Sequence, residues 1–74
     1  MDEIEARNFT WCSAFYPDML LHQHFVVMTP VRGEARDRAA VYAREHWGEP
    51  KTIHVYPRTY VRDARAAYRA GHHD

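Results

Sequence analysis

Four prolines divide this 74-residue chain into five short segments, and each proline stands at the boundary of one segment. Pro17 opens a Pro-Asp turn, Pro30 follows an apolar run, Pro50 comes two residues after Gly48, and Pro57 closes another apolar run. Because proline lacks the backbone N–H that helices and sheets need, no long helix or strand can continue through these positions. The sequence therefore predicts a single small domain of short elements.

Three segments have the features of β-strands. Residues 9–16 are rich in aromatic side chains. In residues 20–28 successive side chains would point alternately to the two faces of a strand, and residues 51–56 place Ile53 and Val55 on one face. The short connection at Pro17 implies an antiparallel hairpin between the first two.

Two segments have helical spacing. The helix before Gly48 starts either at a Thr29 cap or later, near Arg32. Its apolar stripe has spacings of three and four residues: Ala35, Ala39, Tyr42, Ala43 and His46 or Trp47. A second helix is expected from Thr59 to about Gly71, with the stripe Tyr60, Ala64, Ala67 and Tyr68.

These elements predict an α+β fold of order β-β-α-β-α, with a three-stranded antiparallel sheet and two helices on one face. Residues 1–7 and 71–74 are expected to fray, including the Gly-His-His-Asp tail. Strand order and register stay open, because a shift of one residue exchanges the two faces of a strand.

Charge and cysteine content exclude several classes of protein. Ten basic and ten acidic residues give a net charge of zero, which disfavours a general nucleic-acid coat protein. One cysteine can form neither an internal disulfide nor a Cys₄ or Cys₂His₂ zinc site. The acidic N-terminus and the lack of a long apolar run fit neither a secretory signal nor a membrane span, so a reducing cytoplasm is expected.

One stretch of the chain resembles a known group of proteins. It carries His24-Phe25-Val26-Val27, Thr29-Pro30, Glu34-Ala35-Arg36, Trp47-Gly48 and a strand ending in Tyr56. In these features it is similar to small uncharacterised proteins of actinobacterial phages and prophages, which share a hairpin, an "EAR" helix and a closing strand. The resemblance covers less than half of the chain and ends at Tyr56. It implies an accessory role, such as inhibiting or redirecting a host protein, and it brings no catalytic residues.

Histidine and cysteine residues raise two chemical possibilities. His22 and His24 lie two residues apart and share a strand face, and Cys12 on the neighbouring strand could approach them as a transition-metal ligand. The alternative is a polar strand face beside a buried thiol, and whether His54 shares that face stays open. Cys12 with a histidine could also form a nucleophilic pair, but a cysteine within an aromatic strand is typical of core packing. We therefore expect no metal, no cofactor and no enzymatic activity.

An arginine stripe is the strongest candidate for a binding site. Its members recur at spacings of four, three and four residues: Arg58, Arg62, Arg65 and Arg69. Residues 1–37 hold six acidic against three basic residues, whereas residues 38–74 hold four acidic against seven basic. The stripe can bind an acidic protein surface or nucleic acid, remain a solvated face, or pair with Asp2, Glu3 and Glu5.

Aromatic residues are more numerous than a very small core requires. They include Trp11, Phe15, Tyr16, Trp47, Tyr56, Tyr60 and Tyr68. If helices cover one face of the sheet, aromatics on the other face can join two copies of the chain or dock a partner. The alternative is that they form the core.

These observations favour a non-enzymatic accessory protein that binds an acidic host protein and occludes it, for example an inhibitor of host defence of the anti-CRISPR type. Arg58, Arg62, Arg65 and Arg69 would pair with acidic groups, and Tyr60 and Tyr68 on the same helix would add contacts. The alternative is a regulator that binds nucleic acid through this helix.

Overall fold

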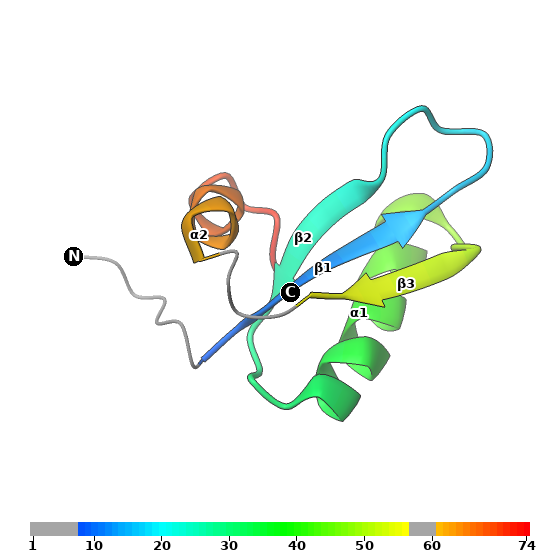
Figure 1. Ribbon diagram of the computed structural model, residues 1–74. Coiled ribbons are helices and arrows are strands. Elements are labelled where there is room, and N and C mark those ends of the chain that lie inside the picture. The colour runs from blue at the N-terminus through cyan, green and yellow to red at the C-terminus, as the bar shows by residue number, and fades with distance from the viewer. Residues whose placement is uncertain (1–7, 57–60) are drawn as a thin grey trace.

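The computed structural model describes residues 8–56 and 61–74, which form three strands and two helices (Figure 1). The elements are β1 (Thr10–Phe15), β2 (Gln23–Val27), α1 (Arg32–Trp47), β3 (Thr52–Val55) and α2 (Val61–Arg69). The predicted α+β class and the order β-β-α-β-α are confirmed. The later of the two expected starts of the first helix is correct, since α1 begins at Arg32.

The sheet has the order β2-β1-β3, and both pairs of strands are antiparallel. β1 is therefore the central strand. Ser13 lies opposite His24 on β2 and opposite His54 on β3, so these three residues form one row across the sheet. The same register places Cys12 opposite Phe25 and Val55 on the other face.

Helix α1 covers the face that carries Cys12 and Phe25. The expected stripe is confirmed, because Ala35, Ala39 and Ala43 are completely buried and let the helix lie close to the sheet. Small side chains at these positions bring the helix backbone within reach of polar groups on the strands.

The second helix lies on the opposite face of the sheet, so the prediction that both helices share one face was wrong. α2 buries Ala64 against Phe9 and Val26, and Figure 1 shows the two helices on either side of the strands. The physical reason is that β2 has buried side chains on both faces of the sheet, with Val26 on one face and its neighbours Phe25 and Val27 on the other. One helix can cover only one face.

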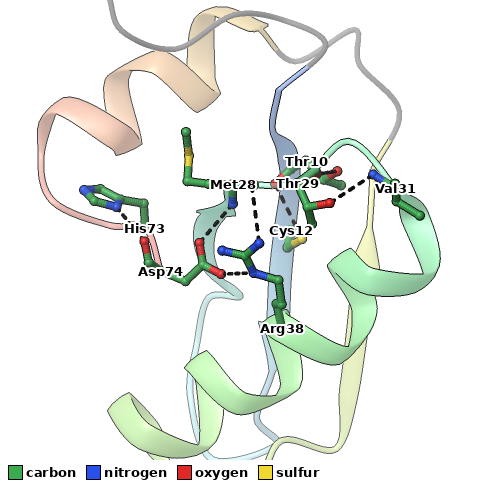
Figure 2. Close-up of polar contacts among 8 residues, drawn as sticks. All are labelled: Thr10, Cys12, Met28, Thr29, Val31, Arg38, His73 and Asp74. Carbon is green, nitrogen blue, oxygen red and sulfur yellow. Dashed lines mark hydrogen bonds and ion pairs between the residues drawn. The ribbon is translucent and has the colours of Figure 1, made fainter.

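Residues 71–74 do not fray as expected, because they pair with the outer edge of β2. The Val26 N–H donates to the His72 carbonyl at 2.9 Å, and the Asp74 N–H donates to the Val26 carbonyl at 3.1 Å. The Asp74 carboxylate accepts from the Met28 N–H at 2.9 Å and from Arg38 Nε at 2.6 Å (Figure 2). A polar tail is thus ordered by the backbone groups that an edge strand leaves unpaired.

The phenol of Tyr16 joins β1 to the end of α1. Its hydroxyl donates to the carbonyl of Ala43 in the last turns of α1 at 3.2 Å and to the carbonyl of the C-cap residue Gly48 at 2.7 Å.

We expect Tyr16→Phe to lower the free energy of unfolding by about 1–2 kcal/mol, because it removes the hydrogen bonds that the phenol donates to these two carbonyls. Urea denaturation measures this loss. Tyr42→Phe is the matched control, since Tyr42 is equally buried and its hydroxyl has no hydrogen bond among the described residues. Equal losses in the two variants would show that Tyr16 contributes only its ring.

Candidate functional site

The short helix α2 covers only part of its sheet face, and a group of rings occupies the rest. We call this group the ring surface: Trp11, Phe15, His22, His24, His54 and Tyr56. Its members come from all three strands and from the end of the β1–β2 loop. Trp11 also packs against the core beneath α2, so the ring surface and the helix form one continuous face.

The rings of this surface contact one another in a chain. The centroids of Trp11 and His24 lie 5.2 Å apart with planes 16° from parallel. His22 and His54 lie 5.5 Å apart at 21°, and His24 and Tyr56 lie 6.1 Å apart at 26°. Such contacts hold the rings in place before any partner binds, which lowers the entropy cost of binding.

Ser13 forms the floor of the ring surface. It is completely buried, and its hydroxyl lies 3.0 Å from the hydroxyl of Tyr56. A serine in this position supports Tyr56 and is not presented to a substrate as a nucleophile.

The pKa of His24 is lowered from its ordinary value of 6.5. The larger cause is the loss of water around the ring, and the second is the neighbouring His22 ring. His24 is therefore mostly neutral at pH 7, which suits flat contact with a partner.

Of the two possibilities left open for Cys12, the structure supports the buried thiol, because Cys12 lies on the other face of the sheet from His22 and His24. Alternation along β1 places its side chain beneath α1, and burial raises the pKa of the thiol to about 12. Across residues 8–56 and 61–74, no group of three or more histidine, cysteine or acidic side chains is arranged to hold a metal ion.

Three of the four stripe arginines lie in the described part of the chain, and together they form what we call the arginine face. Arg62 and Arg69 are exposed and Arg65 is half-buried, and all three line one hollow of about 460 Å³ on α2. Arg58 and Tyr60 lie outside the described residues. Tyr68 turns inward, where it packs on the core beneath α2 and stacks on His73 at 4.4 Å.

Two exposed leucines lie in the β1–β2 loop, next to the ring surface in the chain. Leu20 and Leu21 are 101% and 77% exposed, and they directly precede His22. Two adjacent exposed leucines form a small contiguous apolar patch, and such patches can mark a protein interaction site. Our sequence reasoning missed them because it assigned residues 20–28 to a strand, whereas β2 begins only at Gln23.

Some of the aromatic residues belong to the core, and others lie on the open face of the sheet. Tyr16 and Trp47 belong to the core under α1, whereas Trp11, Phe15 and Tyr56 belong to the ring surface. The three histidines of the ring surface were considered only as metal ligands. The alternation of His54 and Tyr56 on the third strand was the available sign that they share a face with the rings.

We expect His22→Gln to raise the pKa of His24, because it removes one of the two causes that lower it. The folded-state pKa of His24 lies below the unfolded value, so its contribution to stability is complete above pH 6.5 and falls as the pH drops through the folded pKa. An NMR titration of the histidine ring protons measures the pKa of His24 in the unmodified protein and in His22→Gln. His46→Gln on α1 is the control, and an unchanged His24 pKa in His22→Gln would contradict the ring contacts.

We expect Cys12 to resist alkylation in the native protein, because its thiol is buried and its pKa is about 12. Iodoacetamide labelling at mildly alkaline pH, followed by mass spectrometry across a urea series, measures this. Labelling should follow global unfolding, and rapid labelling without urea would show that the thiol is accessible.

No helix among the described residues is long and apolar enough to cross a membrane. Comparison with known proteins gives no match: no family model fits the chain, and no curated protein or solved structure is significantly similar to it. The resemblance to phage accessory proteins therefore stays a prediction.

Proposed function

We propose that this chain is a non-enzymatic binding protein that docks on the acidic surface of a partner protein. One observation carries the proposal: the sheet face that α2 covers holds the ring surface beside the helix that bears the arginine face, and the exposed leucine pair directly precedes His22 of the ring surface. Protein interfaces have this composition, with aromatic side chains at the centre and arginine enriched relative to the rest of the surface.

The leucines favour protein over nucleic acid as the partner. Burying an exposed leucine side chain in an apolar contact contributes about 1.5–3 kcal/mol, and nucleic-acid surfaces offer little apolar area for such a contact. Leu20 and Leu21 are the two most exposed large apolar residues described. They would lie at one end of the contact.

The arginine face would supply orientation at the other end. Guanidinium groups bind carboxylates in a bidentate manner, so Arg62 and Arg69 select for acidic side chains at fixed positions. Because the whole chain has no net charge, attraction comes from this local face and acts mainly at short range.

The proposed action is occlusion of a host protein in the host cytoplasm, as in a small phage inhibitor of host defence of the anti-CRISPR type. What supports it is the resemblance to phage accessory proteins, together with a preformed ring surface and a buried thiol of raised pKa. A protein of this kind acts by covering a surface and needs no catalytic group.

A second candidate is binding of single-stranded nucleic acid, and the ring contacts favour it. Trp11, His24 and Tyr56 lie nearly parallel beside an arginine-bearing helix, and bases stack on such rings while phosphates bind arginine. Salt and nuclease distinguish this candidate from the first.

We expect the double variant Arg62→Glu/Arg69→Glu to lose capture of the partner from host lysate, because like charges then face the acidic surface. Quantitative mass spectrometry of the retained proteins, with nuclease present, measures this. Arg32→Glu/Arg44→Glu is the matched control, since it makes the same charge change on α1, on the opposite side of the sheet.

Leu20→Ser/Leu21→Ser should also weaken capture, at least tenfold, through the loss of apolar burial. Capture that survives all of these changes would contradict the proposal. Retention that disappears with nuclease in the unmodified protein would establish the second candidate instead.

A further inference from the structure

A groove of about 510 Å³ lies on the other side of the sheet, between α1 and residues 73–74. We call it the α1 groove. Its floor is the ring of Tyr42 and the side chain of Val41, which is 46% exposed. Asp37 and Glu45 stand at its two ends, one helical turn before and after Val41. With a rise of about 1.5 Å per residue, the two carboxylates are about 12 Å apart along the helix.

All four arginines of α1 have polar partners, and Arg38, which lines the groove itself, is paired there with Asp74. Arg32 and Arg36 donate to the carbonyls of Val55 and Ile53 at the edge of β3. Arg38 pairs with Asp74, and Arg44 lies 3.8 Å from Glu49.

Asp37 and Glu45, by contrast, form no ion pair with any residue in the described ranges. The groove thus presents an apolar floor between two carboxylates that can accept cationic partners.

Helix α2 has the complementary pattern. Arg62 and Arg69 are seven residues apart, which places them about 10.5 Å apart along the helix. Between them Ala66 is exposed, and with Val61 it lines the hollow of the arginine face. The two patterns are complementary. The arginines of α2 are spaced like the carboxylates of the groove and have the opposite charge, and the small Ala66 leaves room for the exposed Val41.

We propose that the α1 groove binds helix α2 of a second copy of this chain. In this contact Arg62 and Arg69 pair with Asp37 and Glu45, and Val41 enters the hollow beside Ala66. A copy cannot fill its own groove, because α1 and α2 lie on opposite faces of its sheet (Figure 1). The contact is therefore head-to-tail, and it generates chains or a closed ring of copies.

The contact is also weak. A helix of nine residues buries less than the roughly 1,200 Å² typical of stable complexes, so association depends on concentration and on salt. This inference goes beyond the proposed function because it needs no foreign partner, although both use the arginine face.

Sedimentation velocity from micromolar to millimolar concentration tests the inference. The unmodified chain should gain mass with concentration, and both Asp37→Arg/Glu45→Arg and Arg62→Glu/Arg69→Glu should stay monomeric. An equimolar mixture of the first double variant with Arg62→Asp/Arg69→Asp should regain association, because the arginines on α2 of the first meet the native carboxylates in the groove of the second, and the new aspartates of the second meet the new arginines of the first. A mixture of Asp37→Arg/Glu45→Arg with the unmodified chain should give shorter assemblies, because the variant keeps α2 but ends each chain at its groove.

Glu34→Arg/Glu49→Arg is the matched control, because it reverses two acidic residues of the same region that do not line the groove. It should associate like the unmodified chain, and urea denaturation verifies that every variant folds. A monomeric unmodified chain at all concentrations, or unchanged association of Asp37→Arg/Glu45→Arg, would overturn the inference. Capture of a foreign partner by Asp37→Arg/Glu45→Arg reports separately on the proposed function, because that variant leaves the ring surface and the arginine face intact.

Discussion

Three consecutive residues of β2 are completely buried, and the rest of the structure depends on this run. Phe25 and Val27 face one side of the sheet and Val26 faces the other, so both sides must be covered. The long helix α1 covers the first side, and the short helix α2 covers the second. Because α2 has only nine residues, it leaves the far end of its face open, and the ring surface lies there. The candidate site is thus the part of the sheet that the second helix is too short to reach.

The edges of the sheet are closed by polar contacts, which leaves its two sides as the surfaces available to partners. Arg32 and Arg36 donate to outward carbonyls of β3, and residues 72–74 pair with β2 on the opposite edge. An open edge would invite pairing with any extended chain, whereas a covered edge restricts recognition to side chains. Asp74 fixes this arrangement by joining β2 to Arg38 of α1 (Figure 2).

Local features of the sequence were sufficient to predict the existence, type and order of the elements. Proline positions and the alanine stripe of α1 act over a few residues and were interpreted correctly, whereas the second strand was extended too far, since β2 begins only at Gln23. The side of the sheet on which α2 lies was not predicted, because alternation assigns Val26 to a face without showing whether that face is buried. The pairing of His72 and Asp74 with β2 also escaped prediction, since it depends on backbone groups that a sequence pattern does not display. For the candidate site, the shared face of Arg62, Arg65 and Arg69 was predictable from helical spacing, but the row of His24, Ser13 and His54 required the strand order.

Placing the two helices on opposite sides also puts two complementary groups of charges on opposite sides of the sheet. The carboxylates of Asp37 and Glu45 lie on the α1 side, and the arginine face lies on the other, so each copy is complementary to the next. A foreign acidic protein that also contacts the ring surface would bury more area than the α1 groove of a second copy can. Such a partner would therefore displace the self-contact at equal concentration, because the two compete for the same guanidinium groups. Self-association would keep the arginines covered until that partner is present. The foreign partner would then replace the second copy because it gains additional contacts on the ring surface.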